Sequence, residues 1–482
     1  MEYKILLKQH IGAPCAPTVN VGDTVERGAC IASPTGLGAA IHSPFDGKVT
    51  AIDETTITIE ADKASPAEDK YVPLTGNDEK ELIAAAGLVG MGGAGFPTAV
   101  KCNVDLHGGY ILVNAAECEP LLGHNIGQLE KDAPKVIEGV KILKKLCNAK
   151  EGVFAIKAKH KEAVDILAKL CEKEEGIRVH LLPDIYPMGE ERAVVREVLG
   201  KLLSPTDLPS VADAVVINVE TVQRVAEAVI DKRPVITKNV SVAGKLKGGT
   251  HTRVFYDVPL GTTVGELIEQ AGGIDGEYGE IVMGGPFTGK PTTLDAPITK
   301  TTGGIIVTKP FEDLKGAKMG LLLCACGGNE ERMRDIAKKM NAQVEIVQQC
   351  KQAVDIKGTL KCENPGNCPG QAQKCMNIKK AGCTEILIGN CSDCTNTVMG
   401  SAPKLGLNVH HQTDTIFDTV GKERMRYLTT SKTVPQLGEE PEEAVSSPEG
   451  CVYQITQDPE DGLLHIDIKE GKNIEIELPL FF

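Results

Sequence analysis

The sequence predicts an α/β protein built from several domains, and three observations lead to this class. Short β-type segments separated by turn residues fill the beginning of the chain, helix and strand patterns alternate in its centre, and a cysteine-rich segment follows. The 482 residues, 41% of them hydrophobic, provide for about three or four cores. We expect domains at 1–64, 75–234, 235–310 and 316–430, with an acidic linker and a β hairpin within 431–482.

Composition argues against several functions. The net charge is −14 at pH 7, whereas a nucleic-acid-binding protein needs a basic surface against the phosphates. The chain contains no apolar run of about 18 residues, and its first residues lack a signal-peptide core. We therefore expect a cytoplasmic protein without direct membrane insertion or nucleic-acid binding. The sequence leaves a homo-oligomer open.

The first predicted domain is a small β unit. It contains Val-Gly-Asp-Thr-Val at 21–25 and Ser-Pro-Phe-Asp-Gly at 43–47, in which short strand patterns meet turn pairs. This pattern is similar to lipoyl-like β barrel-sandwich domains. Because the candidate tight turn at 34–38 contains no lysine to carry a lipoyl group, the resemblance implies a scaffold.

The segment 90–97 reads Gly-Met-Gly-Gly-Ala-Gly-Phe-Pro and predicts a phosphate-binding loop. Glycines let backbone amides approach an anion without an intervening Cβ. Lys101, one turn further on, is a candidate counter-charge. The apolar run that follows predicts a buried parallel strand, which places Asn114, Glu117 and Glu119 at its carboxyl end, where ligands bind.

Four motifs in this region resemble a known family. The glycine loop is followed by Asn-Ala-Ala-Glu-Cys-Glu-Pro at 114–120, Tyr-Pro-Met-Gly-Glu-Glu at 186–191 and Asn-Val-Glu-Thr at 218–221. Their order resembles the C subunit of the Rnf ferredoxin:NAD oxidoreductase and, more distantly, the flavin subunit of respiratory complex I. The resemblance covers roughly residues 1–310 and implies a Rossmann-like domain that binds FMN and accepts electrons from NADH.

The same resemblance implies the site residues. The flavin would be bound by Gly92, Gly93, Ala94, Gly95, Phe96, Lys101, Asn114, Glu117, Tyr186, Gly189, Glu190, Glu191 and Asn218. Glu119 would lie towards the nicotinamide as a catalytic residue. Met91 and Ile217 depart from the complex I pattern, which has a basic residue and a second asparagine there. Glu190 and Glu191 also have a second interpretation, since carboxylates at the start of the next predicted helix are favoured there.

Residues 235–310 show a different pattern of predicted elements from the α/β region before them. Strand patterns surround a short helix pattern at 266–271 and end near Met-Gly-Gly-Pro at 283–286. This arrangement resembles the β-grasp SLBB module that follows the flavin domain in the same family. The resemblance implies a packing role, and we assign no chemistry to this segment.

The cysteine-rich segment lacks the ferredoxin motifs of the Rnf C subunit. Nine of the 16 cysteines lie from Cys324 to Cys394, and in a reducing cytoplasm such a cluster favours metal binding or thiol chemistry over structural disulfides. Cysteines at successive strand ends, followed by Pro-Gly-Gln at 369–371, are similar to the amino-terminal region of the heterodisulfide reductase A subunit. This resemblance implies a thioredoxin-like fold that holds a [4Fe–4S] cluster, with candidate ligands Cys324, Cys326, Cys362 or Cys368, and Cys391.

Two other interpretations of these cysteines stay open. Cys391 and Cys394 have the Cys-x-x-Cys spacing of a catalytic dithiol relay, in which a helix N-terminus lowers the thiolate pKa. A structural zinc site is the third interpretation, with His410 or His411 nearby.

The whole chain resembles the PrdC family of electron-transfer proteins associated with D-proline reductase. This resemblance implies an enzyme that passes electrons from NADH through FMN and the cysteine-rich domain to a partner reductase, with D-proline reductase subunits as the candidate. The alternative is a non-catalytic scaffold with a decayed flavin site and a structural metal. In the tail, alternating residues within 451–479 predict a hairpin that turns at 470–473.

Overall fold

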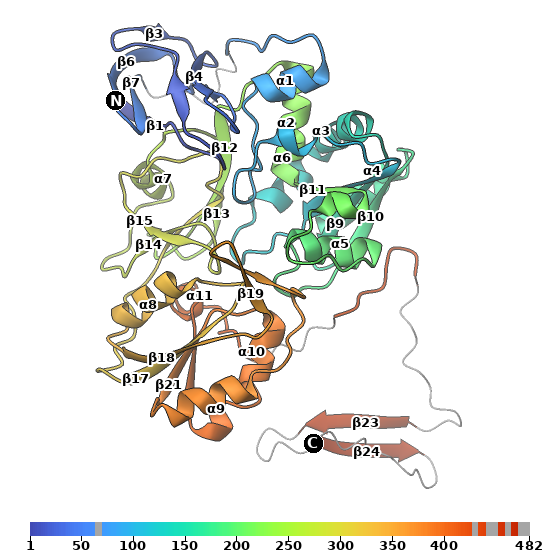
Figure 1. The fold of residues 1–482 in the computed structure, drawn as a ribbon, viewed down its shortest axis with the longest axis vertical. Coiled ribbons are helices and arrows are strands. Elements are labelled where there is room, and N and C mark those ends of the chain that lie inside the picture. Colours follow the sequence, from blue (N-terminus) through green and yellow to red (C-terminus); the bar gives the residue numbers. More distant parts are fainter. Residues whose placement is uncertain (63–69, 427–431, 440–451, 458–463, 471–482) are drawn as a thin grey trace. The chain divides into compact units, whose positions relative to one another are not determined.

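The computed structural model describes residues 1–62, 70–426, 432–439, 452–457 and 464–470. These residues belong to two compact units, Met1–Val434 and Pro435–Phe482. Figure 1 shows the elements in chain order, from blue at the N-terminus to red. The first unit consists of four successive parts, each with its own sheets and apolar core.

Seven strands form the first part: β1 (Glu2–Leu6), β2 (Cys15–Pro17), β3 (Thr24–Val25), β4 (Cys30–Pro34), β5 (Ile41–His42), β6 (Gly47–Ile52) and β7 (Thr56–Glu60). They make two antiparallel sheets, β1-β7-β6-β3 and β2-β4-β5. In β1, Tyr3 and Ile5 are buried in the core while Glu2 and Lys4 are exposed, the alternation typical of a strand with one buried face.

A parallel α/β part follows. Its strands are β8 (Gly109–Ala115), β9 (Ala149–Lys157), β10 (Ile177–Leu182) and β11 (Ala214–Asn218). Its helices are α1 (Glu79–Ala85), α2 (Thr98–Lys101), α3 (His124–Leu146), α4 (Lys161–Cys171), α5 (Glu191–Leu199) and α6 (Val219–Ala226), with a 3₁₀ turn at Pro209–Ala212 and a π turn at Glu227–Asp231. Every strand pair of the sheet β10-β9-β8-β11 is parallel, which confirms the predicted parallel sheet.

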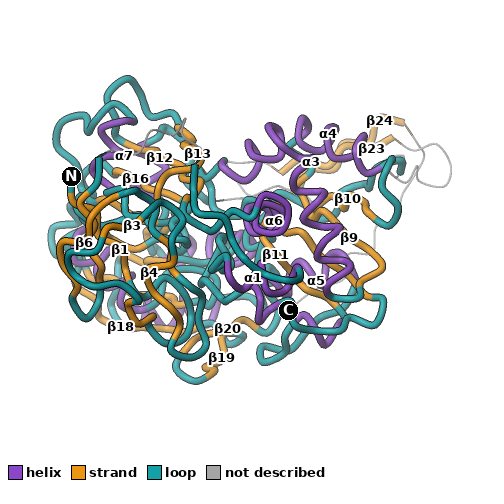
Figure 2. The backbone as a smooth tube through the Cα atoms, turned by 90° about the horizontal axis from the view of Figure 1, so that it is seen from above, coloured by secondary structure: helices purple, strands orange, loops and turns teal. Residues whose placement is uncertain are grey.

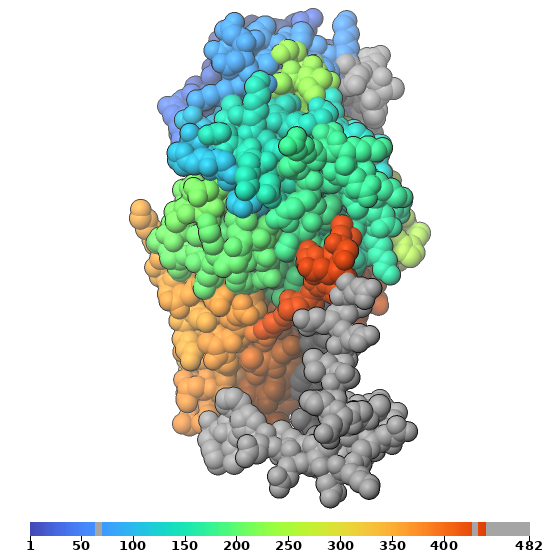
Figure 3. Space-filling view, turned by 90° about the vertical axis from the view of Figure 1, so that its right-hand side faces the viewer, coloured from blue at the N-terminus to red at the C-terminus, as the bar shows by residue number. Residues whose placement is uncertain are grey.

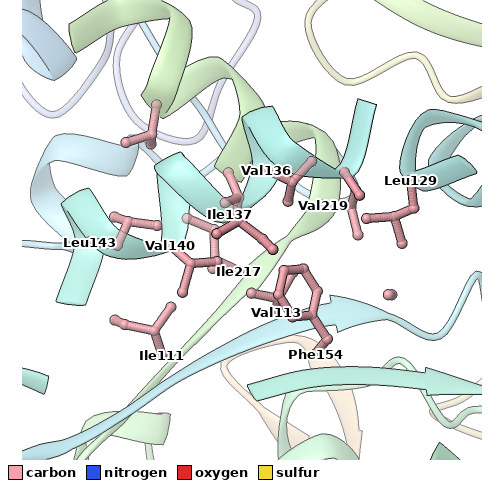
Figure 4. Packing of buried hydrophobic residues seen from close by; sticks show 14 of the residues in the cluster. Ile111, Val113, Leu129, Val136, Ile137, Val140, Leu143, Phe154, Ile217 and Val219 are labelled. Atoms are coloured by element: carbon pink, nitrogen blue, oxygen red, sulfur yellow. The ribbon is translucent and has the colours of Figure 1, made fainter. Parts of the chain in front are cut away.

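Helices cover both faces of this sheet. Ile111, Val113 and Ile217 point to the face covered by α3 and α6 (Figure 4). Leu112 and Val153 belong to the opposite face, which packs on α5. Figure 2 shows α3 and α5 on opposite sides of strands β9 and β11. Because both faces are buried, the strands are continuous apolar runs, as expected of a parallel sheet.

The third part is a mixed sheet with one helix. Its strands are β12 (Thr237–Gly244), β13 (Arg253–Pro259), β14 (Ile281–Met283), β15 (Lys290–Thr292) and β16 (Gly304–Val307), in the order β13-β12-β16-β14-β15. Helix α7 (Val264–Gln270) begins with a capping box, in which Thr263 and Glu266 bind each other's backbone amides.

The cysteine-rich part is a second parallel α/β unit. Its strands are β17 (Lys318–Leu323), β18 (Gln343–Gln349), β21 (Glu385–Ile388) and β22 (Asn408–His411), with a hairpin of β19 (Ala353–Ile356) and β20 (Thr359–Cys362). Its helices are α8 (Glu330–Lys339), α9 (Ala372–Lys380), α10 (Ser392–Met399) and α11 (Asp414–Thr419), with a 3₁₀ turn at Pro403–Leu405.

Helix α8 packs on one face of this second parallel sheet, and α9 and α10 pack on the other. The strand order is β18-β17-β21-β22, and all pairs are parallel, as in a doubly wound sheet. The finer thioredoxin-like assignment therefore stays a prediction.

In the second unit, β23 (Val452–Gln457) and β24 (Leu464–Glu470) form an antiparallel pair. The expected hairpin turn at 470–473 is not the connection between these two strands, which lies at 458–463. The second predicted strand, at 474–478, and most of the acidic linker lie outside the described residues. Within the described ranges, no helix has the length and apolar character needed to span a bilayer.

Candidate functional site

Two asparagines stand at the carboxyl ends of the neighbouring strands β8 and β11. Asn114 and Asn218 are register partners in this parallel pair. The strand order reverses here, since β9 and β10 lie on one side of β8 and β11 lies on the other. Ligands of open α/β sheets bind outside the carboxyl ends at such a switch point. The two asparagines therefore mark the candidate site.

The predicted phosphate loop lies against this switch point. A Cβ on Gly92 would lie 2.5 Å from Nδ2 of Asn218, so the close approach requires glycine. Gly93 has open space instead, with no atom within 4 Å of a Cβ. Gly92, Gly93 and Ala94 are exposed, and no atom of the described residues accepts a hydrogen bond from their amides. The loop thus offers a cradle of unpaired amides that suits a phosphate.

The motif at the start of α6 holds this loop in place. Asn218 caps the helix by accepting a hydrogen bond from the amide of Glu220 at 2.9 Å. Oγ1 of Thr221 accepts a hydrogen bond from the amide of Met91 at 2.9 Å. The fully buried carboxylate of Glu220 forms an ion pair with the equally buried Lys238. Each polar residue of the motif therefore has a structural role beside the loop.

The end of the loop contacts the first β part. Gly95 has φ +75°, and its carbonyl accepts a hydrogen bond from the amide of Ile11 at 3.1 Å. Phe96, which follows, is half-buried. Lys101, in the last turn of α2, forms an ion pair with Glu191 at the start of α5. The predicted counter-charge thus lies one helix turn from the loop and is shared with a carboxylate.

The segment before α5 encloses the other side of the switch point. Nδ2 of Asn114 donates to the carbonyl of Gly189 at 2.8 Å. A Cβ on Gly189 would lie 3.0 Å from the Cβ of Cys118, so glycine permits this approach. Glu190 caps α5 by accepting a hydrogen bond from the amide of Arg192 at 2.9 Å. The capping interpretation of Glu190 is confirmed, while its contact with a flavin stays a prediction.

A cavity of about 580 Å³ opens beside the switch point. Its wall combines the ends of β8, β9 and β10 with the third and fourth parts of the chain, and includes Lys157, Phe287 and Met425. Burial raises the pKa of Glu117, which also lines the cavity, to about 8. This carboxyl group is therefore mostly protonated at neutral pH and can donate a hydrogen bond.

Glu119 connects the α/β part to the third part. Its Oε2 accepts a hydrogen bond from the amide of Phe287 at 2.8 Å. Its Oε1 accepts from the amide of Thr288 at 2.9 Å and from the hydroxyl of the same residue at 2.6 Å. Both oxygens are thus engaged, and the predicted catalytic role of Glu119 stays a prediction.

Tyr186 lies where the α/β part meets the cysteine-rich part. Its ring stacks on Phe287 with centroids 3.6 Å apart. Its hydroxyl donates to the carbonyl of Cys326 at 2.5 Å, and its amide donates to Oγ of Ser392 at 2.9 Å. One predicted flavin residue therefore touches the backbone of one predicted cluster ligand.

Three cysteines of the last part follow the ends of adjacent parallel strands. Cys324 follows β17, Cys350 follows β18, and Cys391 stands at the start of α10 after β21. Hydrogen-bond contacts between thiols link Cys324 to Cys326 and Cys350, and link Cys326 also to Cys362 and Cys391. The resulting group of five thiols, named here the thiol group, gathers at the carboxyl edge of the sheet.

Cys368 and Cys394 form a separate pair. Their thiols are in hydrogen-bond contact, and this contact lowers the pKa of Cys368 to about 6 and raises that of Cys394. Of the candidate ligands, Cys368 is thus the one outside the thiol group. The Cys-x-x-Cys spacing predicts a pair of Cys391 and Cys394, whereas the contact of Cys394 is with Cys368 from another loop.

The two candidate histidines are engaged elsewhere. Nε2 of His410 lies 2.8 Å from a carboxylate oxygen of Glu385. The ring of His411 bonds to Thr413 and to the carbonyl of Asn390, and burial lowers its pKa to about 4. Among the described residues, no group of three or more His, Cys, Asp or Glu side chains has an arrangement suited to a single metal ion. Iron–sulfur clusters take cysteine thiolates as ligands, and a cluster held by the thiol group stays a prediction.

Two arginines of α5 hold the loop between β20 and α9. Nη1 of Arg192 donates to the carbonyl of Cys362 at 2.7 Å. Nη1 of Arg196 donates to Oδ1 of Asn364 at 2.8 Å and to the carbonyl of Pro365 at 2.6 Å. In Figure 3 the green surface that includes this helix adjoins the orange surface of the cysteine-rich part. The first two turns of the helix that begins beside the switch point thus contact Cys362 and the loop that follows it.

Sequence reasoning missed Cys350 and the partner of Cys394. Cys350 directly follows β18, so the rule that cysteines stand at strand exits would have found it. The pair of Cys368 and Cys394 joins residues from two loops, and no local pattern announces it.

Comparisons with known proteins follow the same division of the chain. Residues 83–227 match the model of the Nuo51 FMN-binding domain, and residues 1–66 match the model of the RnfC barrel sandwich hybrid domain. The chain is 32% identical over 324 residues to the cobalamin reductase PduS of Salmonella typhimurium, an alignment that covers 67% of each chain.

Two relatives come from ion-translocating complexes. The C subunit of the Na(+)-translocating ferredoxin:NAD(+) oxidoreductase complex of Acetobacterium woodii is 30% identical over 321 residues, which cover 63% of this chain and 72% of the relative. The C subunit of the ion-translocating oxidoreductase complex of Rhodobacter capsulatus is 32% identical over 348 residues, covering 67% and 65%.

Among solved structures, a chain of the NAD+-reducing [NiFe]-hydrogenase in the H2-reduced state has 22% identity and a TM-score of 0.39, covering 48% of this chain and 47% of that one. The chain therefore spans about two thirds of the length of the sequence relatives and about half of the hydrogenase chain.

Proposed function

The chain belongs to the family of the Rnf-type C subunits, and from this membership we propose that it is an electron-transfer flavoprotein. In this proposal it takes electrons from NADH at an FMN site and passes them through the thiol group to a partner reductase. The observation that carries the proposal is the cradle of unpaired amides at the switch point, joined through nearby residues to the thiol group.

The glycine loop would hold the FMN phosphate. The open amides of Gly92, Gly93 and Ala94 supply donors, and Lys101 one turn away supplies positive charge. The ion pair of Lys101 with Glu191 holds the lysine in place before a phosphate binds. A phosphate therefore meets donors that need little rearrangement, which lowers the cost of binding.

The flavin ring would lie along the carboxyl ends of β8 and β11. Asn114 and Asn218 stand there side by side, and Gly189 leaves room because it has no Cβ. Glu117, with its raised pKa, can donate a hydrogen bond to a ring acceptor. FMN supplies the chemistry of accepting two electrons as a hydride and releasing them singly or together.

The cavity of about 580 Å³ would admit the nicotinamide end of NADH. Lys157, buried in its wall, lies 3.0 Å from Asp184, so its positive charge is held facing the cavity region. Phe287 adds an aromatic face, and Glu119 fixes its position through the backbone. These features favour a planar, negatively charged ligand. The catalytic role of Glu119 beside the nicotinamide rests on the family resemblance alone.

The thiol group would bind a [4Fe–4S] cluster, with ligands from Cys324, Cys326, Cys350, Cys362 and Cys391. Five thiols exceed the four that a cluster needs, and neither candidate histidine contacts them. Four thiolates also suit zinc, so the cluster is preferred here because of the family resemblance. Tyr186 connects the flavin side to Cys326 directly.

Further parts of the proposal rest on resemblance. The acceptor is a partner reductase, for which D-proline reductase subunits are the candidate. The SLBB fold of the third part and the thioredoxin-like fold of the fourth are proposed on the same ground.

The test is a spectrum of the full chain purified without oxygen. We expect flavin bands that NADH bleaches, together with iron and sulfide. In Gly93→Leu the new side chain fills the open space of the loop, so flavin should be lost. Gly36→Leu is the matched control, because Gly36 also has no atom within 4 Å of a Cβ but lies in the first β part. A colourless wild-type protein that contains zinc would instead favour the scaffold, and flavin retained by Gly93→Leu would refute the assigned loop.

A further inference from the structure

Cys368 and Cys394 stand apart from the thiol group. Cys368 lies in the loop before α9, and Cys394 lies in the first turn of α10. Their thiols are in hydrogen-bond contact with each other. A disulfide needs two cysteines whose sulfurs can approach each other, and the loop before α9 brings Cys368 to the first turn of α10, where Cys394 stands.

Neighbouring side chains surround both sulfurs with polar groups. Oγ1 of Thr397 lies 3.1 Å from Sγ of Cys368, and Nε2 of Gln371 donates to the same sulfur at 3.4 Å. Nδ2 of Asn390 donates to Sγ of Cys394 at 3.0 Å. Hydrogen-bond donors stabilise the thiolate form of a sulfur, which is the form that attacks disulfides.

The two sulfurs differ in access. Cys394 is only 1% exposed, whereas Cys368 is partly exposed. An incoming molecule can therefore reach Cys368 and cannot reach Cys394 directly. This asymmetry is that of an attacking thiol with a protected second thiol behind it.

We propose that Cys368 and Cys394 form a redox-active dithiol that exchanges with a disulfide of a partner protein. Cys368 is the attacking thiol, and Cys394 is the resolving thiol. The pair replaces the relay of Cys391 and Cys394 that the Cys-x-x-Cys spacing suggests, because the thiol of Cys391 contacts Cys326.

The exchange balances in two steps. The thiolate of Cys368 attacks one sulfur of the partner disulfide, an S–S bond forms between the two proteins, and the other partner sulfur leaves with the electron pair and takes a proton from water. Cys394 then loses its proton and attacks the sulfur of Cys368, which releases the second partner thiol. Two thiols of this chain are oxidised to one disulfide, and one partner disulfide is reduced to two thiols.

The dithiol lies next to the thiol group. Nε2 of Gln371, which donates to Cys368, also donates to Sγ of Cys350 at 3.2 Å. Electrons that reach the thiol group would thus be separated from the Cys368–Cys394 pair by the side chain of Gln371 alone. The exchange itself needs no flavin, so its test is independent of the proposed function.

The test uses glutathione disulfide as the probe. The full chain is purified without oxygen, reduced with dithiothreitol, freed of reductant and mixed with the probe, and the disulfides are located by mass spectrometry of an unreduced digest. We expect a Cys368–Cys394 disulfide and two glutathiones released per pair. Cys394→Ser should stop after one release with glutathione on Cys368, and Cys368→Ser should leave Cys394 unmodified.

Two controls accompany these variants. Cys375→Ser removes a fully buried thiol whose sulfur accepts from Ser401, and it should behave as wild type. Exposed Cys30 should acquire glutathione equally in every variant, which shows that the probe reacts equally in each sample. A disulfide between Cys394 and Cys391, or wild-type protein without a Cys368–Cys394 bond, would overturn the proposal.

Discussion

The buried ion pair of Glu220 and Lys238 gives a prediction whose size follows from the structure. Both side chains are fully buried, and Glu220 also accepts a hydrogen bond from the amide of Asn239 at 2.8 Å. In Glu220→Ala the ammonium group of Lys238 keeps only the carbonyl of Asn239, at 2.9 Å, as an acceptor. Breaking a buried pair from one side costs about 3–5 kcal/mol, because an uncompensated charge is left inside.

The assay is thermal unfolding. With about 2–4 °C per kcal/mol for a domain of this size, the midpoint of Glu220→Ala should fall by about 6–20 °C. The double variant Glu220→Met, Lys238→Met should recover most of the loss, because replacing both charges with apolar side chains is often neutral. FMN affinity should fall with stability in the single variant, since Glu220 stands between the two residues that hold the glycine loop.

The sign of the pH dependence adds a second check. Burial lowers the pKa of Lys238 below its ordinary value, and the loss of Glu220 removes the charge that opposes this shift. The unfolded chain then binds more protons than the folded chain, so the variant should gain stability relative to wild type as pH rises towards the ordinary lysine pKa. As the control, Glu330→Ala breaks an exposed pair with Arg334 and should change stability by less than about 1 kcal/mol. A loss below about 1 kcal/mol in Glu220→Ala, or a double variant as unstable as the single one, would refute the reasoning.

Three further predictions concern the site. The rate at which iodoacetamide labels Cys368, measured at each pH, should rise with a midpoint at about pH 6. In Cys394→Ala the midpoint of this rise should move up towards about 8.5, because the thiol that donates a hydrogen bond to the thiolate is gone. Tyr186→Phe should keep its ring stacking but lose the hydrogen bond to the carbonyl of Cys326, lowering stability by about 1–3 kcal/mol in chemical unfolding, whereas an unchanged value would mean that the contact is not formed. Glu119→Gln should speed hydrogen exchange at the amides of Phe287 and Thr288, which donate hydrogen bonds to this carboxylate. Equal protection of the two amides in both proteins would contradict these hydrogen bonds.

The glycine loop could be predicted from the sequence because its chemistry is local. Four glycines within six residues, followed by a strand that ends in Asn114, place unpaired amides at the end of a parallel sheet. The role of Gly92 could not be predicted, since it depends on the approach of Asn218 from a distant strand. The local pattern thus identified the loop, whereas the tertiary contact with Asn218 explains why position 92 requires glycine.

Long-range contacts also explain the residues whose surroundings the sequence did not show. Glu119 follows a strand end, as predicted, but its carboxylate is bound by Phe287 and Thr288, which are 168 and 169 residues away. Cys394 is three residues from Cys391, yet its thiol contact is Cys368 because the loop before α9 folds onto α10. The Cys-x-x-Cys spacing describes residues that are close in sequence, so it does not predict a contact with the distant loop that carries Cys368.

The contacts of Tyr186 and of the two α5 arginines have a kinetic consequence. A carrier that swings on a hinge must push solvent aside at every turnover, so its rate falls in viscous media. Here Tyr186 donates a hydrogen bond to the carbonyl of Cys326. Arg192 donates to the carbonyl of Cys362 at the end of β20, and Arg196 donates to the loop that carries Cys368. Electrons crossing this fixed contact would need no moving arm, and their transfer within the chain should proceed equally fast in glycerol and in water.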